Sequence, residues 1–184
     1  MPSPISDYVP QFPSPAESAR VRRGAVWVWA LTASGALAIL GLTVLAPWAR
    51  ANGHTFLSTA AYGAFAGLCH QIPERSFHLE GFPLAVCARC FGLYAGAAAG
   101  VLLYPLARGL ARRDAPARVW LLLAAAPSTL DFALGFFGFW ENTHLSRFLT
   151  AVLLGVCVAF YVVPAALDLG YRRSLRRALR GAAA

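Results

Sequence analysis

The chain has 184 residues, of which 58% are hydrophobic and only 13% are charged, and its mean hydropathy is +0.56. A chain of this length has too small an interior to bury so much apolar surface, so a soluble domain is excluded and lipid must solvate the excess. The net charge of +8 comes from arginine alone, and the arginines are clustered between apolar stretches rather than interleaved with aromatic residues, so nucleic-acid binding is not expected.

The N-terminal half contains one predicted membrane span. Residues 1–24 are rich in proline and serine and predict a disordered cytoplasmic tail. Residues 25–48 form an apolar run long enough to cross a hydrocarbon core of about 30 Å. Residues 55–68 are also apolar, but the run is too short to cross and predicts a re-entrant or interfacial helix. A polar stretch, residues 69–81, follows it.

Three further spans are predicted in the rest of the chain, at residues 84–107, 119–140 and 148–167. Each is a long apolar run bounded by polar or charged residues. Residues 25–170 are therefore expected to form an all-α polytopic membrane domain of about four transmembrane helices, and residues 171–184 a basic cytoplasmic tail.

The distribution of arginine predicts the orientation in the cell membrane. Three, four and five arginines lie in residues 20–23, 108–118 and 172–180, and only four lie elsewhere. The positive-inside rule places these three clusters, and with them both termini, on the cytoplasmic side. A fifth span at residues 55–68 would move the middle cluster outside, which is why four spans are predicted. Residues 69–81 then face outward.

A cysteine- and histidine-rich cluster is expected at the outer end of the second span. Cys69 and His70 precede the span, and Cys87 and Cys90 lie at its start. Residues three apart on a helix share a face, so Cys87 and Cys90 point the same way, and Tyr94 joins that face one turn later.

The first interpretation of this cluster is a site for a divalent metal ion, with zinc as the first candidate. Three sulfur atoms and one imidazole match a common zinc ligand set. The predicted ligands are Cys69, His70, Cys87 and Cys90. Because adjacent residues do not readily reach one ion, His78 or His54 is a possible replacement for His70.

Two other interpretations of the thiols remain open. In one, the CxxC pair carries out thiol–disulfide chemistry, because the helix dipole and Arg89 lower a thiol pKa there and Cys69 supplies a resolving thiol. Four-helix membrane thiol oxidoreductases that pass electrons to quinones have a CxxC pair in a similar setting, an analogy of architecture. In the other, the cysteines form a structural disulfide or only pack.

A ridge of small residues lies on roughly the opposite side of the second span, at Gly92, Gly96 and Gly100. Small residues four apart let another helix approach closely. The ridge is therefore a predicted docking face for a membrane-protein partner or a second copy of the chain, as a non-catalytic subunit would need.

Asp131 lies within the third predicted span, where a carboxylate is costly and usually has a partner. Arg89 and Arg147 are the candidate partners, in a structural ion pair or in a proton or ion relay. Further polar residues follow the span, either completing a site with the cysteines or forming a solvated connection: Glu141, Asn142, His144 and Arg147.

The segment from Cys69 to Gly100, with its runs CHQIPERSF and CARCFGLYAG, resembles a family of small predicted membrane proteins, the domain of unknown function DUF2085. The hallmark of the family is CHQxPxRSF followed after a spacer by CxRCxGxYxG. Residues that match it here are Cys69, His70, Gln71, Pro73, Arg75, Ser76, Phe77, Cys87, Arg89, Cys90, Gly92, Tyr94 and Gly96. The resemblance implies a membrane protein and singles out Gln71, Arg75 and Arg89 as further polar site candidates.

A second region of resemblance covers Asp131 and residues 142–155. The family has an aspartate in the third span and then Asn-x-x-Arg-x-x-Thr-Gly. This chain keeps Arg147 and Thr150 but has His144 in place of the asparagine and Ala151 in place of the glycine. The family has no established activity, so the resemblance does not choose among the interpretations of the thiols.

Overall fold

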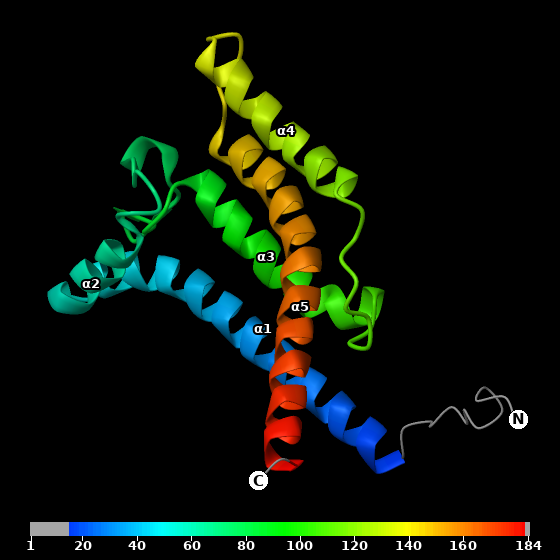
Figure 1. The fold of residues 1–184 in the computed structure, drawn as a ribbon. Coiled ribbons are helices and arrows are strands. Elements are labelled where there is room, and N and C mark those ends of the chain that lie inside the picture. The colour runs from blue at the N-terminus through cyan, green and yellow to red at the C-terminus, as the bar shows by residue number, and fades with distance from the viewer. Residues whose placement is uncertain (1–14, 183–184) are drawn as a thin grey trace, which may run out of the picture.

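The computed structural model describes residues 15–182, which form an all-α fold with one short β-hairpin (Figure 1). The helices are α1 (Pro15–Ala51), α2 (Thr55–Phe65), α3 (Ala88–Ala107), α4 (Val119–Phe136) and α5 (His144–Ala182). Four of them are long and apolar enough to cross a membrane, whereas α2, with 11 residues, is too short. The predicted all-α polytopic membrane fold, with about four transmembrane helices and a short helix before the CHQ segment, is confirmed.

The first and last helices extend beyond the predicted spans. Residues 15–24, predicted to be disordered, instead form the first turns of α1, while residues 1–14 of the predicted tail lie outside the described residues. Proline is well tolerated in the first turn because its missing N–H would have no acceptor there. α5 continues through the arginine-rich segment to Ala182, since Ala, Leu and Arg favour helix. Most of the predicted basic tail is therefore a helical extension.

The inner helix ends also differ from the prediction. α3 begins at Ala88 rather than at residue 84, because the backbone N–H of Ala85 donates to the Thr43 carbonyl of α1 at 3.1 Å and holds this segment outside the helix. α4 ends at Phe136, before the positive φ of +75° at Gly138 that terminates the helix. α5 begins at His144, earlier than predicted.

The predicted glycine ridge is occupied by α5 of the same chain. Gly92, Gly96 and Gly100 all face α5, and a Cβ atom on Gly96 would meet the backbone of Val152. Gly155 on α5 in turn lies against the backbone of α3. Two helices approach this closely only where neither carries a side chain at the contact. The ridge is therefore not a docking face for a partner or a second copy, and that prediction is corrected.

The outer faces of α1 and α4 remain uncovered by protein. Only 11% of the most apolar segment of each is buried within the chain. Leu31 on α1 and Leu122 on α4 are each 71% exposed. In water such surfaces would drive aggregation, so their stable environment is lipid. The fold is thus that of a multi-pass membrane protein.

The three arginine clusters lie at one end of the helices and the CHQ segment lies at the other (Figure 1). The start of α1, the loop between α3 and α4, and the end of α5 all lie toward this basic end, and α1 and α5 extend past the loop. There the guanidinium of Arg113 lies 3.6 Å from the ring centroid of Tyr171. At the opposite end lie α2, the hairpin and the starts of α3 and α5. The charge asymmetry in the sequence is therefore also an asymmetry of the folded chain.

Candidate functional site

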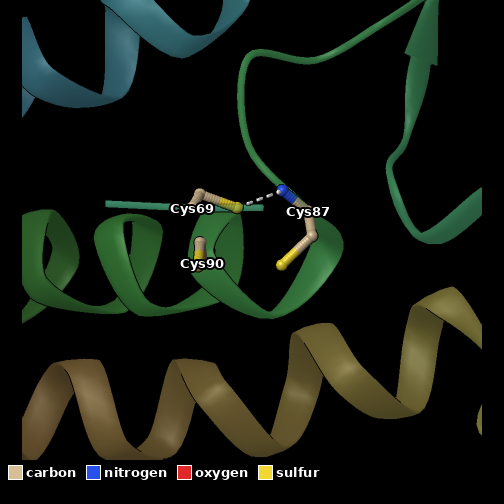
Figure 2. Close-up of side chains that lie close together, drawn as sticks. All are labelled: Cys69, Cys87 and Cys90. Atoms are coloured by element: carbon tan, nitrogen blue, oxygen red, sulfur yellow. Dashed lines mark hydrogen bonds between the residues drawn. The ribbon is translucent and has the colours of Figure 1, made fainter. Parts of the chain in front are cut away.

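Three thiol groups come together where the CHQ segment meets the start of α3 (Figure 2). The Sγ atoms of Cys69, Cys87 and Cys90 all lie within 4.8 Å of one another. The backbone N–H of Cys87 donates to the Sγ atom of Cys69 at 3.3 Å. Cys87 is the N-cap residue of α3, and Cys90 lies in the first turn of that helix. All three cysteines are free thiols.

Gln71 positions the CHQ segment beside α3. Its side-chain amide donates to the backbone carbonyl of Tyr62 at 2.7 Å and to that of Ala85 at 2.9 Å. The hydroxyl of Tyr62 donates to the carbonyl of Pro83 at 2.5 Å. Gln71 has a φ of +51°, which is uncommon for a residue other than glycine. These bonds hold the chain near Cys69 against the segment that leads into Cys87.

A small hairpin returns the chain from the CHQ segment to α3. It consists of β1 (His78–Leu79) and β2 (Phe82–Pro83), which pair in antiparallel register. The two turn residues, Glu80 and Gly81, both have positive φ angles, as a tight type I′ hairpin turn requires. The backbone N–H of Leu84 donates to the Phe77 carbonyl at 2.7 Å and closes the loop.

Among the residues that the structure describes, no histidine joins the three thiols. His70 is exposed while the adjacent Cys69 is buried, because neighbouring side chains of a non-helical segment point in different directions. His54 lies beside Trp48, and His78 is exposed on the hairpin. Of the four predicted ligands, the structure thus brings together Cys69, Cys87 and Cys90, and neither His70 nor His78 joins them.

The Cys87 thiol is strongly acidic. Hydrogen bonding lowers the pKa of Cys87 to about 5, against the opposing effect of burial. The hydrogen bond from the Cys90 thiol contributes most, and the Cys69 thiol and the backbone N–H groups at the start of α3 contribute as well. Cys87 is therefore a thiolate at neutral pH, the form that binds metals and attacks disulfides.

An ion pair joins α3 to α4 next to the thiols. The guanidinium of Arg89 donates to a carboxylate oxygen of Asp131 at 2.7 Å, and Asp131 is only 8% exposed. The Arg89 guanidinium also lies 5.4 Å from the ring centroid of Phe132. The side-chain amide of Asn142 donates to the backbone carbonyl of Asp131. Of the two candidate partners for Asp131, the structure thus selects Arg89 and not Arg147.

An aromatic cluster that sequence analysis missed fixes the hairpin to the helices. The rings of Phe77, Phe91 and Phe148 lie 5.7 to 6.0 Å apart, one from the loop, one from α3 and one from α5. The ring of His144 lies 5.7 Å from that of Phe77, and its Nε2 atom is 3.1 Å from the carbonyl oxygen of Glu74. Phe77 belongs to the RSF part of the motif, and this was the one feature of the sequence that pointed to the aromatic cluster.

A cavity of about 750 Å³ lies beside the thiols, and most of the predicted polar residues line it. Its lining includes three cysteines and three arginines: Cys69, Cys87, Cys90, Arg75, Arg89 and Arg147. His70 also borders it. Tyr94 packs instead on Phe65, with a ring separation of 5.9 Å, on the side of the thiols nearer α2. The candidate site is therefore a thiol cluster that opens into a basic cavity.

The chain is similar to predicted membrane proteins of one family. The family described as "Predicted membrane protein (DUF2085)" matches residues 69–161, which contain the thiols and the three arginines. The uncharacterized protein MJ1492 of Methanocaldococcus jannaschii is 34% identical over 134 residues, or 70% of this chain and 86% of that protein. An uncharacterized protein of Methanothermobacter thermautotrophicus is 33% identical over 98 residues, or 52% of this chain and 84% of its own. No solved structure matches the chain. The predicted family is thus confirmed, and the chain belongs to the DUF2085 family of predicted membrane proteins.

Proposed function

We propose that Cys69, Cys87 and Cys90 bind a divalent metal ion, with zinc as the first candidate, at the outward face of the cell membrane. The observation that carries this proposal is the convergence of three sulfur atoms within 4.8 Å of one another. Zinc–sulfur bonds of about 2.3 Å in a tetrahedral site place sulfur atoms about 3.8 Å apart. Small side-chain rotations would bring the thiols to that spacing.

The fourth coordination position would face the cavity, which all three cysteines line. Structural zinc sites are usually closed by four protein ligands, whereas catalytic sites keep one position for water or substrate. Three cysteine ligands beside an open cavity support the second arrangement. The acidic thiol of Cys87 adds to this support, because a ligand already ionised at neutral pH binds without first losing a proton.

The arginine asymmetry supports the outward position of the site. The basic end of the bundle would remain in the cytoplasm under the positive-inside rule, together with the ends of α1 and α5 that lie there. The thiols, at the opposite end of α3, would then face the outside of the cell.

Metal analysis of the full chain purified in detergent tests the proposal. We expect about one zinc ion per chain, lost in the Cys87→Ser variant because two thiolates alone bind weakly. Cys157→Ser is the matched control, since Cys157 lies in α5 with its thiol 3.4 Å from the Trp120 carbonyl, away from the cluster. Wild-type protein that stays metal-free after incubation with zinc contradicts the proposal.

A thiol–disulfide oxidoreductase is the second candidate, and the acidity of Cys87 beside two further thiols favours it. Oxidation of the Cys87 thiolate and the Cys90 thiol would form one disulfide and pass two electrons and the Cys90 proton to a quinone, which would take its second proton from water. Metal-free protein that loses two free thiols per chain when a quinone is added, with equal reduction of the quinone, would replace the metal proposal with this one.

A further inference from the structure

Three arginines from separate elements converge on the cavity. Arg75 belongs to the short 3-10 helix η1 (Pro73–Arg75), Arg89 to the start of α3 and Arg147 to the first turn of α5. They are distant in sequence, so their meeting is a product of the fold and not of a local basic run. Like charges gathered on one cavity repel one another, and this cost is offset when an anion lies between them.

Two of the three arginines on the cavity have no ion-pair partner in the described residues, although the acidic Cys87 thiol also lines the cavity. Within residues 15–182, Arg89 is the one of the three that forms an ion pair, with Asp131. Arg75 and Arg147 form none there, and the one carboxylate on the cavity lining is that of Glu141. Two guanidinium groups are therefore free to donate hydrogen bonds to a ligand in the cavity.

Two helix N-termini add to this positive field. α3 begins at Ala88 and α5 at His144, and residues from the first turn of each helix line the cavity. The first N–H groups of a helix lack intrahelical acceptors, and the helix dipole makes that end attractive to anions. The field of the cavity thus comes from backbone as well as from side chains.

One wall of the cavity is apolar. Phe132, Phe136 and Trp140 come from α4 and the turn after it, and they are 52%, 73% and 61% exposed. The wall therefore continues onto the surface of α4 that lipid covers. A ligand that fits both parts of the cavity has an anionic group for the arginines and an apolar group for this wall.

We propose that the cavity binds the phosphate group of an anionic amphiphile. A tetrahedral phosphate offers several oxygen atoms to guanidinium groups that arrive from different directions, and arginine binds phosphate in a bidentate manner. The same chemistry is supplied by the headgroup of an anionic phospholipid or by a soluble phosphate compound. The proposal does not depend on a metal at the thiols.

Native mass spectrometry of the full chain released from detergent tests the proposal. Phosphatidylglycerol and phosphatidylcholine with identical acyl chains are compared, because they share the phosphate but differ in net charge. We expect phosphatidylglycerol to bind more tightly, and the double variant R75Q/R147Q to weaken that binding on the order of tenfold or more, since hydrogen bonds to charged groups are lost. The preference for phosphatidylglycerol then disappears in that variant.

The double variant R22Q/R23Q is the matched control. It removes the same charge from exposed positions of α1 at the opposite end of the bundle and is expected to keep the preference. Monodisperse elution and the circular-dichroism spectrum of R75Q/R147Q report whether it folds; the single variant R75Q, at an exposed position, replaces it if it does not. Cys87→Ser is expected to keep lipid binding while losing zinc, so the two proposals fail separately.

Inorganic phosphate distinguishes the two sources of the ligand. If phosphate raises the melting temperature of wild type but not of R75Q/R147Q, and the two lipids bind equally, the site takes a soluble phosphate compound. If phosphatidylglycerol is preferred and phosphate has no effect, the site takes a lipid headgroup. Equal lipid binding with no effect of phosphate overturns the proposal, as does equal loss in R22Q/R23Q and R75Q/R147Q.

Discussion

Arg89 belongs to the CxxC segment and also forms the ion pair with Asp131. It lies between the two cysteines, and the carboxylate to which it donates is on α4. A carboxylate within a membrane span is costly and needs a partner, so the sequence predicted Arg89 or Arg147 beside Asp131, and the first is confirmed. The sequence did not choose between them, because that choice depends on where α4 lies.

A double-mutant cycle on Arg89 and Asp131 tests whether the ion pair stabilises the fold. Asp131→Asn leaves Arg89 without its counterion, and Arg89→Gln leaves Asp131 buried alone, so each is expected to lower the free energy of unfolding by about 1–3 kcal/mol. The combined variant is expected to lose clearly less than both losses together. Unfolding in detergent, followed by circular dichroism, measures the three values; additive losses would show that the pair is not coupled.

His70 was predicted to join the three cysteines, but its side chain does not lie with theirs in the structure. The motif places His70 next to Cys69, and spacing alone does not say which of two adjacent side chains faces α3. That depends on the backbone of the CHQ segment, which bends at Gln71 with its φ of +51°. A positive φ at glutamine has no sequence signature, so the error could be found only in the structure.

At the scale of the element, α3 and α5 form the tightest unit of the fold. The glycine spacing predicted that another helix would approach this face of α3 closely, but it did not predict which helix. A ridge of small residues accepts a helix of the same chain and a helix of another chain equally well. The hairpin was missed for a related reason: its strands have two residues each, too few for any alternation.

Two glycine substitutions test this packing. In Gly96→Ala the new methyl group meets the backbone of Val152, and we expect a loss of about 1–3 kcal/mol in the free energy of unfolding. Gly41→Ala on α1 is the matched control, because its Cβ atom meets nothing within 4 Å and alanine favours helix. Its expected effect is neutral or slightly stabilising. A Gly96→Ala protein as stable as Gly41→Ala would mean that the two helices do not touch there.

At the scale of the whole molecule, composition was the most reliable guide. Chain length and residue counts alone imply that lipid solvates the excess apolar surface, whatever the arrangement of the helices. The residues at which the helices begin and end were predicted less accurately. Capping and tertiary contacts, such as the one between Ala85 and Thr43, decide these positions.

The orientation is tested by labelling introduced cysteines in intact cells with a membrane-impermeant maleimide. Glu74→Cys, at an exposed site in the CHQ loop, is expected to react, and Asp114→Cys, exposed between α3 and α4, to react only after the membrane is permeabilised. The unsubstituted chain gives the background from its own thiols. Labelling of Asp114→Cys alone in intact cells would place the thiol cluster in the cytoplasm.

The backbone contact between α3 and α5 has a consequence for how the cavity changes shape. Over Gly92 and Gly96 the two helices meet backbone to backbone, which leaves little room for either to shift against the other. We therefore expect the thiols, at the start of α3, and Arg147, in the first turn of α5, to keep their separation. α4 is largely uncovered by protein and is joined to α3 by the Arg89–Asp131 pair. We expect a change in the shape of the cavity to come from α4 rather than from α3 and α5.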